Sequence, residues 1–334
     1  MKKSIFFLLL IKTLSVFSQT EIEILSETKG LSFRGLSVIS DGVFWISGNN
    51  GTVGKSIDGG KTIEWLTVQG FEKSDFRDIE AFDSKTAIIM AIAEPAYILK
   101  TIDGGKSWQL VYENHKKGMF LDALDFDHKS PNKGIVVGDT IDGKIFLLKT
   151  SDSGSTWQEF EEKPTSIEQE GCFASSGTNI VVRKNDNYFV TGGKNSRFFK
   201  NGIAIQIPII QGTETTGANS IAVSENRKNI IIVGGDFSAK NDSIDNCLIS
   251  KNGGKSFLKS IKNPKGYRSC VEFISKKKAI TCGLNGIDIS KDKGLNWLNI
   301  SHVSFHVCQK SPNGKVVYFA GANGKVGKMI NHPN

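Results

Sequence analysis

Residues 101–108 read Thr-Ile-Asp-Gly-Gly-Lys-Ser-Trp, and related octapeptides recur along the chain. The shared pattern is Ser/Thr-x-Asp/Asn-x-Gly-x-Ser/Thr/Asn, followed in four of the five copies by Trp or Phe. The copies begin at Ser56, Thr101, Thr150, Ser250 and Ser290. A motif that returns at intervals of tens of residues indicates repeated supersecondary units rather than a single catalytic loop.

The motif has a mechanical explanation as a tight hairpin turn. Its Asp or Asn side chain can accept hydrogen bonds from backbone N–H groups of the turn, and its Gly allows the positive φ that a short hairpin needs. The alternative is that these turns themselves bind a carbohydrate or calcium. We favour the structural interpretation. The residues interpreted as structural are Asp58, Asp103, Asp152, Asn252 and Asp292.

The spacing of the copies predicts the number of repeats. Successive copies start 45, 49, 100 and 40 residues apart, and Phe-Lys-Asn-Gly at 199–202 lies in the middle of the long gap as a degenerate copy. A second recurring turn, Gly48-Asn-Asn-Gly51, returns as Gly321-Ala-Asn-Gly324 and marks a last unit. Seven units of about 44 residues have the length of four-stranded propeller blades. The sequence therefore predicts an all-β fold, a seven-bladed β-propeller.

The two ends of the chain are expected to share one blade. The seventh unit stops at Asn334 before an outer strand can form, whereas residues 21–25 alternate as Glu-Ile-Glu-Ile-Leu. We expect this N-terminal strand to complete blade seven, which would remove two exposed sheet edges. A single propeller domain is expected to span residues 19–334.

Residues 1–18 are typical of a secretory signal peptide, with Lys2 and Lys3 before an apolar run at 5–11 that is too short to cross a bilayer. This predicts a periplasmic or secreted protein with no membrane insertion. Without the three lysines of this segment, 39 basic residues stand against 34 acidic ones, a net charge of +5. The lysines are spread through turns, so a nucleic-acid partner is not expected.

Five cysteines, an odd number, leave at least one thiol unpaired within the chain. Cys270 and Cys282 are expected on adjacent strands and could form a disulfide, although buried free thiols are the favoured interpretation. The absence of Cys-x-x-Cys argues against zinc and against a redox dithiol. No metal and no cofactor are predicted.

A second series of residues starts the innermost strands. Phe33-Arg34, Phe76-Arg77, Tyr267-Arg268 and Phe305-His306 stand at matching places in their repeats, and Leu121-Asp122 and Cys172-Phe173-Ala174 begin other blades. In a propeller such residues converge at one mouth of the central channel. We expect Arg34, Arg77, Arg268, His306 and Asp122 to form a pocket for a carboxylate, a phosphate or an acidic peptide. The alternative is that Asp78, Glu80, Asp122 and Glu170 pair with the arginines and hold the channel together.

These residues also carry a family resemblance. Ser32-Phe-Arg34-Gly-Leu-Ser-Val with the later Gly48-x-x-Gly51-Thr-Val53, Asp75-Phe-Arg-Asp-Ile-Glu-Ala-Phe-Asp83, and Gly266-Tyr-Arg-Ser269 resemble propellers of the photosystem II stability/assembly factor-like family, in its secreted bacterial branch. The turns also resemble the Asp-boxes (BNR repeats) of sialidase-like propellers. The resemblance implies a seven-bladed scaffold. For the photosynthetic members it implies assembly of a membrane complex through an Arg-rich patch.

Three functions compete. The favoured hypothesis is a monomeric, non-catalytic binding or assembly propeller whose partner is an anionic small molecule or a protein, so that enzyme activity is not expected. A sialidase-like glycoside hydrolase is the first alternative, although Gly35-Leu36 replaces the Ile-Pro expected there and Tyr267 is expected to point away from the channel. An oxidoreductase, a name often given to such chains, would need a nucleotide turn, a haem Cys or a metal cluster that the sequence lacks.

Overall fold

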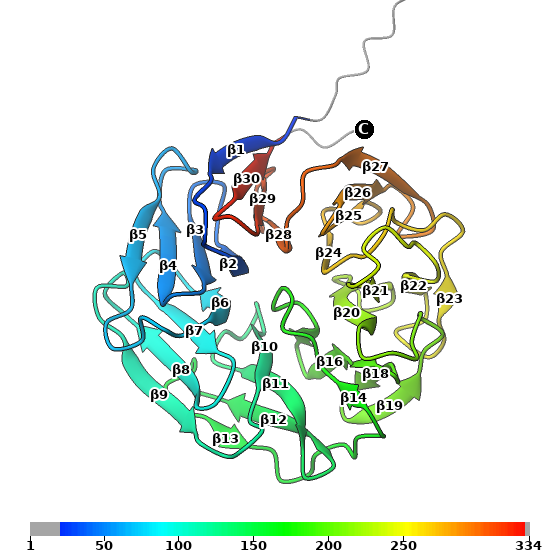
Figure 1. Ribbon diagram of the computed structural model, residues 1–334, viewed down its shortest axis with the longest axis horizontal. Coiled ribbons are helices and arrows are strands. Elements are labelled where there is room, and N and C mark those ends of the chain that lie inside the picture. Colours follow the sequence, from blue (N-terminus) through cyan, green and yellow to red (C-terminus); the bar gives the residue numbers. More distant parts are fainter. Residues whose placement is uncertain (1–20, 331–334) are drawn as a thin grey trace, which may run out of the picture.

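The computed structural model describes residues 21–330, so the predicted signal segment lies outside the described residues. The chain forms seven antiparallel four-stranded blades arranged in a ring around a central axis (Figure 1). All assigned elements in residues 21–330 are strands. The all-β, seven-bladed propeller predicted from the repeat is confirmed. Over the same residues, no helix has the length and apolar character needed to cross a membrane.

Each blade is a meander whose first strand lies nearest the axis. Blades one to three contain β2 (Phe33–Val38), β3 (Phe44–Gly48), β4 (Thr52–Ser56), β5 (Glu64–Thr67); β6 (Phe76–Ala81), β7 (Ala87–Ala91), β8 (Ala96–Thr101), β9 (Gln109–Asn114); and β10 (Leu121–Phe126), β11 (Gly134–Ile141), β12 (Lys144–Thr150), β13 (Gln158–Glu159). Blades four and five contain β15 (Ile180–Arg183), β16 (Asp186–Val190), β18 (Arg197–Lys200), β19 (Ile203–Gln206); and β20 (Thr216–Val223), β21 (Ile230–Asp236), β22 (Cys247–Ser250), β23 (Leu258–Lys259). Two short strands, β14 (Glu170–Gly171) and β17 (Gly192–Gly193), extend blade five beyond β20. Blade six contains β24 (Cys270–Phe273), β25 (Ala279–Gly283), β26 (Gly286–Ser290) and β27 (Trp297–Ser301).

The last blade is built from both ends of the chain, as predicted. It contains β28 (Val307–Lys310), β29 (Val317–Ala320), β30 (Val326–Met329) and, as its outer strand, β1 (Glu23–Ser26). Glu23 lies opposite Lys328 in the antiparallel pair of β1 with β30. Figure 1 shows these two strands side by side at the point where the ring closes. The pairing of β1 with β30 therefore closes the ring between blades one and seven.

The apolar core consists of layers between neighbouring blades. Ile88 and Met90 of blade two pack with Val136 and Leu148 of blade three, and all four side chains are fully buried. Equivalent clusters lie between the other neighbouring blades. The second strands β3, β7, β25 and β29 are buried at every residue, which explains why they read as nearly continuous apolar runs.

The five recurring turns form the same hydrogen bonds. In the turn of blade two, the Thr101 hydroxyl accepts the Gly105 N–H at 3.0 Å, and the Asp103 carboxylate accepts the Ser107 N–H at 3.0 Å. The equivalent bonds recur in the other four turns. Because all five turns follow the third strand of a blade, they share one face of the ring, which we call the box face.

Hydrogen bonds also link the innermost strands of all seven blades. In each pair, an acceptor on one blade binds a backbone N–H of the next, and we call the set the inner ring. Its acceptor–donor pairs are Gln309–Val38, Ser37–Ala81, Asp78–Leu124, Asp125–Val182, the Thr178 carbonyl–Ile221, Ser220–Val271 and Glu272–Lys310. Three of these acceptors, on Asp78, Asp125 and Glu272, are carboxyl groups in a buried setting. Ionisation of these groups is therefore coupled to the packing of the inner ring.

Candidate functional site

The face opposite the box face carries a set of β-bulges at the start of the innermost strands. In blade one, Phe33 pairs with Gly48 and Gly35 pairs with Ser47, so Arg34 is the extra residue between them. The same shift occurs at Arg77 in blade two, Asp122 in blade three and Asn219 in blade five. A bulge redirects a side chain that a regular strand would place elsewhere. Three of the predicted site residues therefore owe their position to one repeated backbone irregularity.

Arg34 differs from the other arginines because no carboxylate pairs with it. Its guanidinium donates to the Ser175 carbonyl at 3.1 Å, and burial followed by the neighbouring charge of Arg77 lowers its pKa. Within residues 21–330, each of the remaining five arginines has a carboxylate partner within 4 Å. Glu170, which the sequence offered as a partner for the mouth arginines, pairs instead with Arg197. A partly buried cation without a counter-ion is a costly arrangement that a bound anion would relieve.

Arg77 and Asp122 lie close enough to influence each other, yet the structure shows no ion pair between them. The Arg77 Nε donates to Asp75 at 2.8 Å. Asp122 is fully buried, and neither of its carboxylate oxygens has a hydrogen-bond partner. Burial, and then the charge of Asp139, raise the pKa of Asp122 well above its usual value, against the opposing effect of Arg77.

His306 occupies the equivalent position in blade seven, immediately before the pair formed by Val307 and Ala320. Its Nδ1 lies 3.1 Å from the Phe33 carbonyl oxygen, a contact in which the ring nitrogen donates. Burial, then the charges of Arg34 and Arg77, lower the pKa of His306 to about 3. The imidazole is therefore neutral at physiological pH and adds no charge to the group. We call Arg34, Arg77 and His306 the arginine cluster.

The structure places Arg268 differently from the sequence interpretation. Cys270 pairs with Cys282, the residue before Gly283, so Ser269 takes the bulge position and Arg268 matches the buried Phe33. Arg268 is fully buried, and its Nε donates to Asp288 at 2.6 Å. A shift of one residue reverses the side on which a strand side chain lies. The sequence interpretation aligned Phe33-Arg34 with Tyr267-Arg268 because the two dipeptides are similar, and it therefore missed this shift.

The same shift moves Tyr267 toward the arginine cluster, contrary to expectation. Its hydroxyl donates to the Asn219 side-chain oxygen at 2.8 Å, and the Arg34 charge acts on it. Burial raises the pKa of Tyr267 to about 12. An ionised tyrosine nucleophile activated by a carboxylate would require a different partner, because Asn219 offers only an amide.

A loop from blade four lies across the axis beside this cluster. The sequence interpretation began the innermost strand at 172–174, but that strand, β15, begins at Ile180. The Ser175 hydroxyl donates to Asn219 of blade five, the Ser176 hydroxyl donates to the Ser269 carbonyl of blade six, and a Cβ at Gly177 would collide with Asp78 of blade two. Figure 1 shows the green part of the chain reaching toward the centre of the ring. The segment Ser-Ser-Gly-Thr-Asn at 175–179 is rich in turn-forming residues. This composition could have indicated a loop here instead of the start of a strand.

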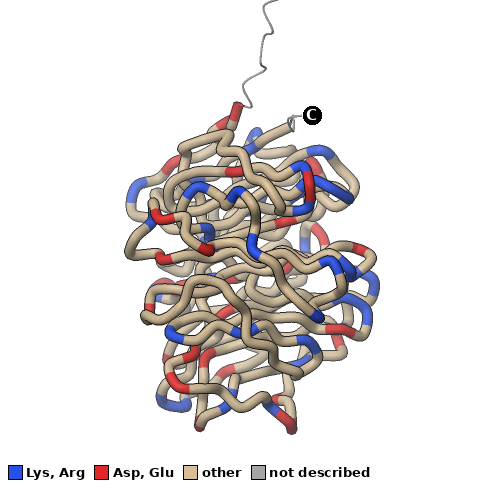
Figure 2. The backbone as a smooth tube through the Cα atoms, turned by 90° about the vertical axis from the view of Figure 1, so that its right-hand side faces the viewer, with Lys and Arg blue, Asp and Glu red and all other residues tan. Residues whose placement is uncertain are grey.

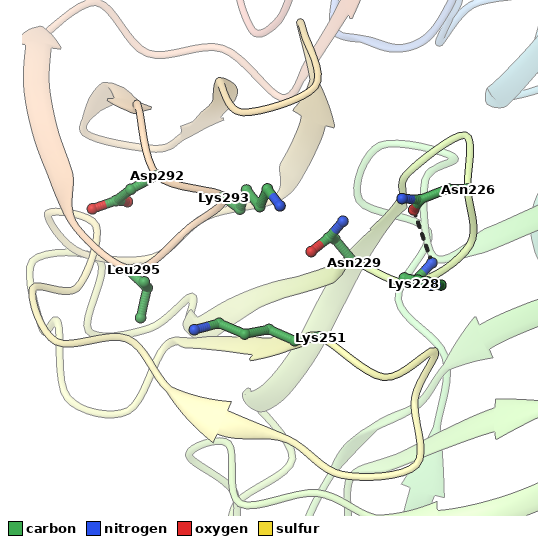
Figure 3. A pocket seen from close by; sticks show the side chains of 7 residues that line it. All are labelled: Asn226, Lys228, Asn229, Lys251, Asp292, Lys293 and Leu295. Carbon is green, nitrogen blue, oxygen red and sulfur yellow. Dashed lines mark hydrogen bonds between the residues drawn. The ribbon is translucent and has the colours of Figure 1, made fainter.

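Two surface hollows lie away from the arginine cluster. One, of about 420 Å³, lies between the box turns of blades five and six and is lined by Asn226, Lys228, Asn229, Lys251, Asp292, Lys293 and Leu295 (Figure 3). The other, of about 680 Å³, is lined by residues 21–22 and 299–303 beside β1. Along the side of the ring, basic and acidic residues are interspersed (Figure 2), so no continuous basic band marks a nucleic-acid surface in this view.

The fold and the bulge-borne cluster define a seven-bladed propeller with a polar, partly charged mouth, and comparison with solved structures places it among known propellers. YCF48 bound to D1 peptide is similar with a TM-score of 0.64 and 17% identity over 95% of this chain and 96% of that one. YCF48 from Cyanidioschyzon merolae gives a TM-score of 0.63 and 17% identity over 92% and 98%. The GH74 xyloglucanase from Xanthomonas campestris gives 0.59 and 11% over 92% of this chain and 53% of the enzyme.

These likenesses confirm the family resemblance at the level of the fold. YCF48, a photosystem II assembly factor, shares the seven-bladed architecture over nearly the whole chain. No family model and no curated protein matches the sequence.

Proposed function

We propose that this protein is a non-catalytic binding or assembly propeller that holds a carboxylate of a protein partner at the arginine cluster. The observation that carries the proposal is the partly buried Arg34, which has no carboxylate partner among the described residues and lies within the field of Arg77. A carboxylate placed between two guanidinium groups can accept charge-assisted hydrogen bonds from both. The YCF48 structure with a bound D1 peptide supports peptide capture as a function that this fold can serve.

The surroundings favour binding over glycoside hydrolysis. Retaining and inverting glycosidases use a pair of acidic groups or, in sialidases, a tyrosine nucleophile. Here Tyr267 is hydrogen-bonded to the amide of Asn219, and Asp122 is enclosed without a hydrogen-bond donor. The xyloglucanase likeness concerns the fold alone.

We also propose that the protein acts as a monomer outside the cytoplasm, on the strength of the signal-like segment at 1–18 and the closed ring. An anionic small molecule with a carboxylate would satisfy the same two arginines, so the binding test includes one. Fractionation of cells expressing the full chain checks the location. Recovery of the protein only from the cytoplasm would contradict export.

The binding proposal is tested with Arg77→Gln. The probes are fluorescent peptides ending in Asp or Glu with a free carboxylate, the same peptides amidated, and sialic acid as an acidic sugar. We expect the free-acid peptides to bind, and Arg77→Gln to weaken that binding at least tenfold, or about 1.4 kcal/mol. Thermal melting should change little, because the Arg77 pair with Asp75 is partly exposed.

Arg227→Gln is the matched control, since Arg227 also pairs with an aspartate, Asp186, but lies outside the cluster. It should leave peptide binding unchanged. Equal binding of free and amidated peptides, or an equal loss in both variants, would overturn the proposal. Binding of sialic acid in preference to every peptide would redirect it toward an acidic sugar.

A further inference from the structure

Three of the five cysteines meet in the core between blades six and seven. Cys270 on β24 lies directly opposite Cys282 on β25, and Cys308 comes from β28 of the next blade. All three are free thiols, and none has more than 1% of its surface exposed. Cys172 and Cys247 are also free and buried but lie outside this group.

The sulfur atoms are arranged as a compact triangle. All three lie within 4.8 Å of one another, and Sγ of Cys308 lies 3.7 Å from Sγ of Cys270. Metal–sulfur bonds of about 2.3 Å would put the sulfurs of a planar three-coordinate site about 4 Å apart. The observed triangle therefore needs only small adjustments to place one ion among the three sulfurs.

A backbone hydrogen bond reaches one corner of this triangle. The Cys308 backbone N–H donates to Sγ of Cys270 at 3.4 Å. A thiolate is the form that binds metal ions.

We propose that Cys270, Cys282 and Cys308 bind one monovalent copper ion with three sulfur ligands. Soft thiolate ligands select Cu(I), zinc or iron–sulfur clusters. Structural zinc is almost always four-coordinate, and this group of metal-ligating side chains contains no fourth His, Asp, Glu or Cys among the described residues. Each thiol that binds as a thiolate releases its proton to solvent, and no electron transfer is needed.

The site would connect the innermost strands of the last two blades. Cys270 and Cys308 each stand two residues before the inner-ring pair in which the Lys310 N–H donates to Glu272. An ion shared by β24 and β28 would add a link near the closure of the ring. This inference is independent of the arginine cluster and survives if the binding proposal fails.

The test measures copper in the full chain. The protein is produced in copper-supplemented medium, purified without oxygen, and assayed for metal content and for near-ultraviolet thiolate–Cu(I) absorbance. Because the site is buried, a second sample is incubated with Cu(I) held by a chromogenic chelator, during refolding as well as in the folded state. We expect one equivalent of copper per chain and a rise in Tm on loading.

Cys308→Ser should reduce bound copper at least tenfold, and Cys172→Ser and Cys247→Ser are the matched controls that should retain it. Cys282→Ser provides a second cluster variant if Cys308→Ser fails to fold. The proposal would be overturned by no copper retained under any loading condition, by retention in both cluster variants, or by a Cys270–Cys308 disulfide in the protein as isolated. Preferential binding of zinc over Cu(I) would also overturn it.

Discussion

At the box face, five turns in five different blades repeat one set of hydrogen bonds, down to the hydroxyl that accepts the glycine N–H. At the opposite face, the equivalent bulge positions differ from blade to blade. They carry Arg34, Arg77, Asp122, Asn219, Ser269 and His306. Repetition is what a scaffold needs, because each blade must bury the same layers. Variation on the same backbone feature is what a binding site needs, because a ligand is asymmetric.

The box turns are also joined to the rest of the scaffold. The residue three places after the start of each turn donates to a carbonyl in the loop between the first two strands of its blade, as Gly104 does to Lys85 at 2.8 Å. Lys55 and Lys100 reach across to the turns of the following blades, at Gly104 and Ser153. The box face therefore connects neighbouring blades as well as closing hairpins. Changes there should affect stability and leave the arginine cluster intact.

The largest expected effect comes from removing β1, the outer strand of blade seven. Deletion of residues 21–26 leaves β30 as an open edge and opens the ring between blades one and seven. We expect Tm to fall by more than about 10 °C, the equivalent of several kcal/mol for a chain of this size. Circular dichroism melting measures this.

A synthetic peptide spanning the deleted strand is the complement for that experiment. Added in excess, it should restore part of the lost Tm by pairing with β30. An unchanged Tm in the deletion variant would show that closure by β1 contributes little. The two faces would then have to be stabilised separately, blade by blade.

An intermediate effect is expected from Thr101→Val in the turn of blade two. Valine keeps the shape but removes the hydroxyl that accepts the Gly105 N–H and donates to Asp103. Because Thr101 is buried, the free energy of unfolding should fall by about 1–2 kcal/mol. Urea denaturation measures this, and Thr67→Val on the exposed outer strand of blade one serves as the control.

Peptide binding by folded Thr101→Val should match that of the unchanged protein. Loss of binding with unaltered stability would break the contrast between the faces, and the box turns would then have to be treated as part of a functional site.

The sequence was sufficient for the parts of the fold that repeat. The spacing of the turns indicated seven blades, and the alternating segment at 21–25 indicated the strand that closes the ring. Arg268 was misplaced because dipeptide matching ignores bulge register. If Gly283 is aligned with Gly48, the residue that matches Arg34 at the bulge position is Ser269 and not Arg268. The loop at 175–179 and the contact of Cys308 with Cys270 depend on packing between blades, which no local pattern encodes.

A pH-dependent effect is expected in the inner ring, which lies between the two faces. Glu272 accepts the Lys310 N–H at 2.7 Å, and burial raises the pKa of Glu272 to about 8 from an ordinary value of 4.5. In the folded protein this carboxyl stays protonated up to about pH 8, whereas in the unfolded chain it ionises above about pH 4.5. Unfolding therefore releases a proton between these values, and the contribution of Glu272 to stability declines as pH rises through that window.

Glu272→Gln keeps an acceptor for the Lys310 N–H but cannot ionise. It should match the unchanged protein near pH 4.5 and exceed it in free energy of unfolding by about 1 kcal/mol or more at pH 8.5, since one pKa unit corresponds to about 1.4 kcal/mol. Urea denaturation at both pH values measures the difference, with the exposed Glu225→Gln as the control. If the two proteins lose stability in parallel from pH 4.5 to 8.5, Glu272 does not carry this pH dependence. Asp78, whose pKa burial also raises, would then be the inner-ring group to change next.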